Sequence, residues 1–177
     1  MASSGGKRAV GTDGHDFKYR QRVDDHYKLM AGARKALKRA ARLQLGSAMG
    51  LATIGGTSFA LPSSATAPSL PLCAAASLLS AAAARMGLAA AGAATLPAAR
   101  LGLNSALCKA QLAGALCAGG MAAAAALSAE GSDFSFAAAM CVLSLASLLG
   151  GLLGVRSAAS LARAFEEQTK KKAAAAR

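Results

Sequence analysis

The stretch Phe134–Val155, FSFAAAMCVLSLASLLGGLLGV, decides the class of fold. Its 22 residues carry no charge, and eight of them are Leu or Val. A helix needs about 20 consecutive apolar residues to cross the hydrocarbon core of a bilayer. The stretch therefore predicts a membrane-spanning helix, and the chain is predicted to be an all-α integral membrane protein with about four transmembrane helices and cytosolic helical ends.

A longer uncharged region lies earlier in the chain, at Leu43–Ala84. Its 42 residues are enough for two spans and a tight turn. Pro and Ser residues gather at 62–71 and mark that turn. We therefore expect a first span at Leu43–Leu61 and a second at Pro71–Ala94, with Ala84 as an alternative end of the second.

The remaining spans are separated by short polar segments. Leu96–Leu103 contains Pro and Arg and predicts a short connection before a third span at Asn104–Ser128. Glu130–Asp133 predicts a sharp loop before the fourth span, Phe134–Val155. After Arg156 we expect a charged helix that runs to about Lys172, followed by a short Ala tail.

Composition and charge divide the chain into a basic arm (residues 1–42), a membrane domain (43–155) and a basic tail (156–177). Hydrophobic residues make up 54% of the chain but aromatic residues only 4%, so a soluble core built mostly from Ala would bury little apolar area. Small residues let neighbouring helices approach closely, and two GxxxG pairs are candidate packing sites. These are Gly46 with Gly50, and Gly150 with Gly154.

Along the chain, segments that carry Lys or Arg alternate with loops that carry none. Of the 20 Lys and Arg residues, eleven precede Leu43 and six follow Val155, while Arg85, Arg100 and Lys109 lie between. The positive-inside rule then predicts that both termini and the middle connection face the cytosol. Basic segments beside long apolar ones favour anionic lipid headgroups over nucleic acid as partners of this chain with a net charge of +12.

The basic arm is predicted to be disordered at Met1–Gly14 and helical from Asp16, with Asp13 or Asp16 as the cap of the first turn. Four apolar or aromatic residues then recur on one helical face: Tyr19, Val23, Tyr27 and Met30. This spacing is typical of a basic helix that lies on a membrane surface. A solvated charged helix without a docking role is the alternative.

Residues that could support catalysis or metal binding are few. The four cysteines lie in apolar stretches without a CxxC pair, and His15 and His26 have no third ligand at useful spacing. We therefore predict no enzyme activity, no cofactor and no metal site. Lys109 lies within an apolar stretch, and we expect it to anchor at the interface rather than to line a transport path. The alternative functions are a small membrane transporter or channel and an organelle inner-membrane protein.

The amino terminus carries a set of residues in one register that resembles the Jagunal family. They are Met1-Ala2-Ser3, Arg8-Ala9, Gly11-Thr12-Asp13-Gly14, Asp16-Phe17, Arg20, Arg22-Val23 and His26-Tyr27. The similarity covers about residues 1–45. It implies a non-enzymatic multi-pass protein of the endoplasmic reticulum membrane. It also implies a role in reticulum organisation and vesicle-mediated transport in the early secretory pathway, with vesicle coat subunits as candidate partners.

The arm and the tail together supply the candidate contacts with lipid headgroups or protein partners. These residues are Arg20, Arg22, Tyr27, Arg34, Lys35, Lys38, Arg39, Lys170, Lys171 and Lys172. The three tail lysines also resemble a signal for retrieval to the reticulum. That signal requires lysines third and fourth from the end, where this chain has Ala175 and Ala174.

Overall fold

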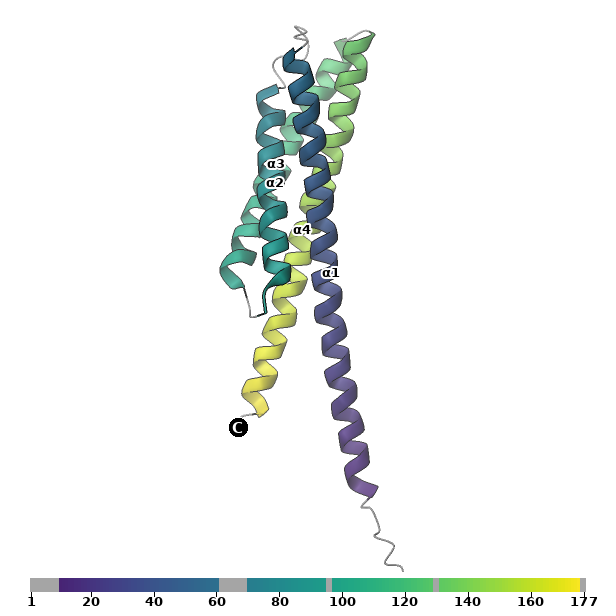
Figure 1. Cartoon of the computed structure of the whole chain (residues 1–177), viewed down its shortest axis with the longest axis vertical. Coiled ribbons are helices and arrows are strands. Elements are labelled where there is room, and N and C mark those ends of the chain that lie inside the picture. Colours follow the sequence, from purple (N-terminus) through teal and green to yellow (C-terminus); the bar gives the residue numbers. More distant parts are fainter. Residues whose placement is uncertain (1–9, 61–69, 95–96, 129–130, 176–177) are drawn as a thin grey trace, which may run out of the picture.

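The computed structural model describes residues 10–60, 70–94, 97–128 and 131–175, and these residues form four long helices (Figure 1). Their bounds are α1 Val10–Ala60, α2 Leu70–Gly92, α3 Ala98–Ser128 and α4 Ser132–Ala175. Helices adjacent in the chain are antiparallel neighbours, and α1 also packs against α4. The order around the bundle is therefore α1, α2, α3, α4, with α1 diagonal to α3.

Buried positions recur alternately three and four residues apart along every helix. This spacing is the signature of left-handed coiled-coil packing, in which one seam of each helix faces the bundle axis. Small and polar residues fill much of these seams in place of the usual large aliphatic ones. On α1 the buried seam is Leu37, Ala40, Gln44, Ser47 and Leu51, and on α3 it is Leu101, Asn104, Cys108, Gln111, Ala115, Ala118 and Ala122.

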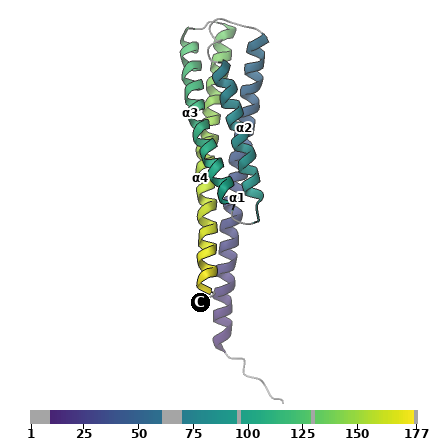
Figure 2. The same ribbon diagram turned by 90° about the vertical axis from the view of Figure 1, so that its left-hand side faces the viewer.

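The basic arm is not a separate surface helix, because α1 continues without a break from Val10 to Ala60. In both views it enters the bundle, where it packs against α4, and in Figure 1 the two helices diverge beyond the bundle (Figures 1 and 2). The physical reason is the seam itself, since Met30, Ala33 and Leu37 continue the register of Gln44 and pack against α4. The helix also begins before Asp13 and Asp16, so neither caps its first turn. Residues 1–9 of the segment expected to be disordered lie outside the described residues, whereas 10–14 are helical.

The other predicted bounds are close to the observed ones, with one correction. Most of Leu96–Leu103, expected to be a connection, belongs to α3, which begins at Ala98 directly after Pro97. Proline is well tolerated at a helix start, where its missing N–H has no partner to lose. The turn expected at 62–69 lies outside the described residues. Before α4, Gly131 adopts a φ of 59°, a left-handed conformation that favours glycine.

Three of the four helices are long and apolar enough to cross a membrane, namely α2, α3 and α4, when the described residues are considered. The predicted all-helical membrane fold is confirmed at that level. Helix α1 is less apolar because Gln, Ser, Thr and Gly interrupt its residues 43–60. The start of α1, the end of α4 and the connection between α2 and α3 all lie toward the same end of the bundle (Figure 1).

Candidate functional site

A network of buried polar side chains joins all four helices. Gln44 of α1 donates from Nε2 to Oε1 of Gln111 on α3, at 2.9 Å, and to Sγ of Cys108, at 3.2 Å. Gln111 donates in turn from Nε2 to the carbonyl oxygen and the hydroxyl of Ser147 on α4, at 2.8 and 3.1 Å. The Ser147 hydroxyl lies 2.8 Å from that of Ser80 on α2. These polar groups satisfy one another away from solvent and fix the register of the four helices.

Glycine residues of α4 leave room for the buried side chain of Gln44. A Cβ placed on Gly150 would lie 2.9 Å from Cγ of Gln44, and one on Gly154 would lie 2.7 Å from Sγ of Cys108. Of the two GxxxG pairs in the sequence, Gly150 and Gly154 therefore do pack against other helices. Gly50 also faces another helix, through Leu143, whereas a Cβ on Gly46 would meet nothing within 4 Å.

Beyond the polar network, α1 and α4 project from the same end of the bundle and diverge toward their ends (Figure 1). We call these two extensions, residues 10–42 and 156–175, the stalk. Its base is an apolar cluster in which Leu37 meets Leu161 and Phe165 of α4 and Leu101 of α3. The same cluster includes Ala90 and Ala91 near the end of α2. The stalk is thus packed onto the bundle at its base, and not linked to it by a loop.

Arg34 has an internal role that the sequence did not indicate. Its Nη2 donates a hydrogen bond of 2.7 Å to the carbonyl oxygen of Ala93, just past the end of α2. Carbonyl groups at a helix carboxyl end lack intrahelical partners and carry partial negative charge, so a guanidinium group is a favourable partner. The bond ties α1 to the connection between α2 and α3, and Arg34 is part-buried there. A contact across 59 positions of sequence leaves no local signal.

Most of the other predicted contact residues are exposed on the stalk. Lys35, Lys38 and Arg39 are exposed on α1, Lys170 is exposed on α4, and Tyr27 keeps 70% of its surface exposed. Arg20, Arg22, Lys171 and Lys172 lie on described helices, but their side chains lie outside the described residues. The structure brings the arm and the tail together only at the base of the stalk, where Met30, Ala33 and Leu37 pack in one cluster with Leu161 and Phe165, whereas the distal parts diverge (Figure 1).

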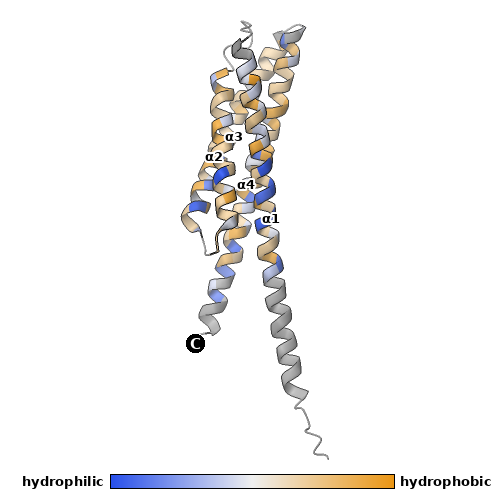
Figure 3. Ribbon diagram, in the orientation of Figure 1, coloured by the Kyte–Doolittle hydropathy of each residue, from blue (hydrophilic) through white to orange (hydrophobic). Residues whose placement is uncertain are grey.

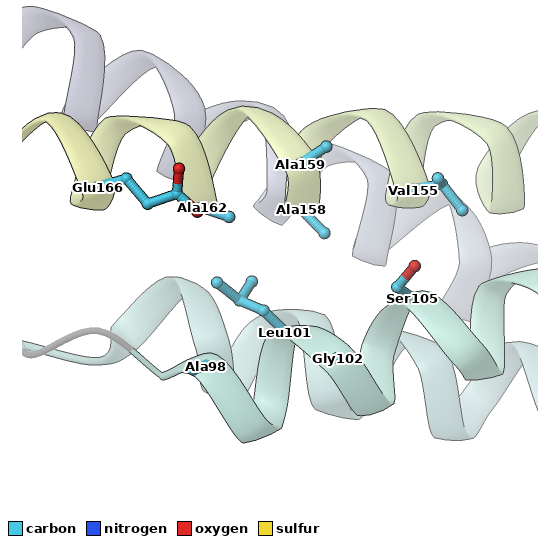
Figure 4. A pocket seen from close by; sticks show the side chains of 9 residues that line it. All are labelled: Ala98, Leu101, Gly102, Ser105, Val155, Ala158, Ala159, Ala162 and Glu166. Atoms are coloured by element: carbon cyan, nitrogen blue, oxygen red, sulfur yellow. The ribbon is translucent and has the colours of Figure 1, made fainter.

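Two grooves flank α4 near the stalk. One, of about 290 Å³, separates the start of α3 from α4, and among its lining side chains only Glu166 is ionisable (Figure 4). The other, of about 750 Å³, lies between α1 and α4 and is lined mainly by Gly, Ala and Ser, with Lys28, Arg163 and Glu167 among its other residues. Neither groove presents the nucleophile and base in mutual contact that covalent catalysis requires.

The described residues include no cluster of three or more His, Cys, Asp or Glu side chains that could hold a metal ion. All four cysteines are free. Cys73 and Cys108 are buried, Cys141 is half-buried, and Cys117 is exposed on the outer face of the bundle. Three of them thus pack as small apolar side chains in the bundle.

Together these features define a class of protein: a membrane-compatible bundle of four helices with a projecting two-helix stalk. Residues 1–51 match the family model described as Jagunal, endoplasmic reticulum re-organisation during oogenesis. This match covers less than a third of the chain, and over that amino-terminal stretch it supports a relation to the Jagunal family. The match ends at Leu51, so it includes the α1 part of the stalk and Gln44. No significant match was found among curated proteins or among solved structures.

Proposed function

We propose that the chain is a non-enzymatic, four-span protein of the endoplasmic reticulum membrane that organises the reticulum through its stalk. The observation that carries the proposal is the Jagunal match at residues 1–51, because that segment builds α1 of the stalk and its anchor in the bundle. The family description refers to re-organisation of the reticulum. Action in vesicle-mediated transport, through coat subunits that bind the stalk, is the finer part of the proposal.

The lengths of the uncharged helical segments support α1 as the fourth span. Residues 43–60 of α1 extend about 27 Å, close to the thickness of about 30 Å of a bilayer core. The uncharged residues 110–128 of α3 extend about 28 Å beside them. All four helices also lie side by side along this length (Figure 2). A bilayer that surrounds α2, α3 and α4 would therefore surround this part of α1 too.

The polar side chains described below, from residues 43–60 of α1, are either buried or hydrogen-bonded within the helix, as a membrane span requires. Gln44 and Ser47 are buried, with 1% and 3% of their surfaces exposed. Thr53 and Thr57 are exposed, but their hydroxyls donate to the carbonyl oxygens of Met49 and Ile54 on the same helix, at 2.9 Å each. Lipid would therefore meet few unsatisfied polar groups. The stalk projects from one end, and positive-inside asymmetry favours the cytosol for that end.

Glycosylation mapping in microsomes tests the span number. Acceptor sites would be placed before residue 10, within 61–69, at 93–97, at 129–131 and after residue 175. Four spans with a cytosolic stalk predict glycosylation only within 61–69 and at 129–131. If α1 does not cross, the amino terminus and 61–69 lie on the same side and are either both modified or both unmodified, and either result contradicts the proposal.

The role of the stalk is tested by rescue of reticulum shape in cells that lack the endogenous chain. One variant replaces residues 1–26 by a Gly-Ser linker of equal length and keeps the packed base of the stalk. We expect it to insert normally but to fail to restore the reticulum. A control variant carries the same linker appended after residue 177 of the intact chain and should rescue. Full rescue by the first variant would show that the distal arm has no part in the function.

One observation favours the transporter alternative, namely that polar side chains face one another inside the bundle. They are uncharged, they bond to one another, and the described helices that carry them have no break. Transport paths are typically built with broken helices and ionisable groups. The network therefore supports a role in helix association more than one in conduction.

A further inference from the structure

Exposed basic side chains from all four helices gather at one level of the bundle. The position of each basic residue along the bundle axis follows from contacts between the helices. Gly87 of α2 lies against Ala41 of α1, which places Arg85 beside Arg42 along the bundle axis. Gly154 of α4 lies against Cys108 of α3 and against Gln44, which places Arg156 and Lys109 within about one helical turn of the same level.

We call this group the collar and define it by four exposed residues, one on each helix. They are Arg42 on α1, Arg85 on α2, Lys109 on α3 and Arg156 on α4. Hydrophilic colours appear on all four helices at this end of the bundle, whereas hydrophobic colours dominate the opposite part (Figure 3). The collar therefore lies where the uncharged slab of the bundle ends.

No acidic residue of the sequence falls within the collar. The sequence has eight acidic residues: Asp13, Asp16, Asp24, Asp25, Glu130, Asp133, Glu166 and Glu167. Among those on the described helices, the nearest to the collar along a helix are Glu166, ten residues past Arg156, and Asp25, 17 residues before Arg42. The collar is thus a belt of one sign, and its side chains have no carboxylate nearby to neutralise them.

We propose that the collar binds the headgroups of anionic phospholipids, so that the bundle retains a shell of these lipids around itself. The inference rests on the proposed four-span arrangement, because only that arrangement sets all four helices in the bilayer. Long Lys and Arg side chains at the end of a span extend their charged groups to the headgroup level. There they experience the negative potential of an anionic leaflet, which decays within about 8–10 Å.

Lipid phosphate is favoured over an acidic protein as the occupant because the basic residues encircle the bundle. A protein surface would contact one side, whereas Arg42, Arg85, Lys109 and Arg156 come from four different helices. Lys28, Arg163 and Lys170 are also exposed, but they lie about 10–21 Å farther along the stalk than Arg42 or Arg156. They lie beyond most of the leaflet potential and form a natural comparison set.

The test uses the full chain reconstituted in vesicles of equimolar phosphatidylcholine and phosphatidylserine. The protein is extracted in mild detergent, and the retained lipids are quantified by mass spectrometry. We expect phosphatidylserine to be enriched several-fold over phosphatidylcholine. The variant Arg42→Gln, Arg85→Gln, Arg156→Gln should bring the ratio close to that of the vesicles. The matched control Lys28→Gln, Arg163→Gln, Lys170→Gln loses the same net charge and should keep the enrichment.

Three outcomes would overturn the inference. One is an unenriched ratio for the unmodified chain. Another is equal loss in both variants, which would show that total charge and not the collar attracts the lipid. The third is a collar variant that keeps its lipids but loses reticulum rescue, which would point to an acidic protein partner. Equal unfolding temperatures of the two variants in detergent would show that a loss of lipid does not result from misfolding. Glycosylation mapping distinguishes failure of this inference from failure of the proposed four-span arrangement. If the four spans are confirmed but no lipid is enriched, only lipid binding by the collar is refuted.

Discussion

Gln44 and Gln111 join the two diagonal helices of the bundle, α1 and α3, by a hydrogen bond of 2.9 Å between Nε2 and Oε1. Both side chains are fully buried, with at most 1% of their surfaces exposed. The neighbouring helices pack through small residues across the seams, whereas this pair reaches across the axis. A polar pair of this kind specifies which helix faces which, a use for which buried polar residues are best attested.

Replacing Gln44 by Leu should destabilise the bundle by about 1–2 kcal/mol, because Oε1 of Gln111 would lose its donor. The change is measured by reversible unfolding in mixed micelles. Thr53→Val is the control, since Thr53 is exposed and bonds only within α1, and its effect should stay within about 0.5 kcal/mol. A double-mutant cycle with Gln111→Leu should show coupling, and strictly additive effects would contradict a direct bond.

Gly154→Ala should destabilise the bundle by about 1–3 kcal/mol because the new methyl would overlap Sγ of Cys108 and approach Gln44. Gly46→Ala offers a matched control in the other GxxxG pair. Its new Cβ would meet nothing within 4 Å, and alanine favours the helix by about 0.5–1 kcal/mol. The same unfolding measurement applies, and equal effects of the two substitutions would refute the packing described for α4.

Arg34→Gln should loosen the connection between α2 and α3, because a shorter neutral side chain cannot hold the carbonyl group of Ala93. A hydrogen bond from a charged donor contributes about 1.5–3 kcal/mol, so exchange of the Ala93 amide hydrogen, which bonds to the carbonyl oxygen of Ala90, should become several-fold faster. Lys35→Gln removes the same charge from an exposed neighbour and should leave exchange unchanged. Unaltered exchange in Arg34→Gln would show that the bond does not restrain the connection.

The order in which the cysteine thiols react tests the packing of the bundle without any substitution. In detergent micelles N-ethylmaleimide, which is small and enters the micelle, should modify Cys117 first, because its side chain faces the detergent while Cys73 and Cys108 are buried in the bundle. Those two should react only after the bundle unfolds, at a rate that follows unfolding. Peptide mass spectrometry at increasing reaction times measures the order. Early modification of Cys108 would conflict with its place beside Gln44 and Gly154.

The membrane class and most limits of the apolar helices could be predicted because they follow from uncharged length and from proline, which act locally. The fourth apolar stretch, Phe134–Val155, lies wholly within α4, and Pro97 precedes the start of α3. The charged helix expected after Arg156 is confirmed as the continuation of α4 to Ala175. Residue composition is sufficient for these features because the bilayer acts on each helix separately.

The stalk and the polar network could not be predicted in the same way. The seam of α1 contains Ala, Gln and Ser, so its contrast with the exposed face is small, and the arm resembled an isolated surface helix. Gln44 and Gln111 each look like a single polar residue in an apolar stretch until the helices are assembled. The available signal was the spacing of Asn104, Cys108 and Gln111, which alternates four and three residues along α3.

Because α1 is one continuous helix, a tilt of α1 at the bundle is transmitted to its distal end. From Val10 to Gln44 it extends about 51 Å without a hinge, so a tilt of about 5° at the bundle would displace the distal end by about 4 Å. Conversely, a force applied to the distal end would exert torque at the point where Gln44 meets α3 and α4, so the load would reach the polar network inside the bundle.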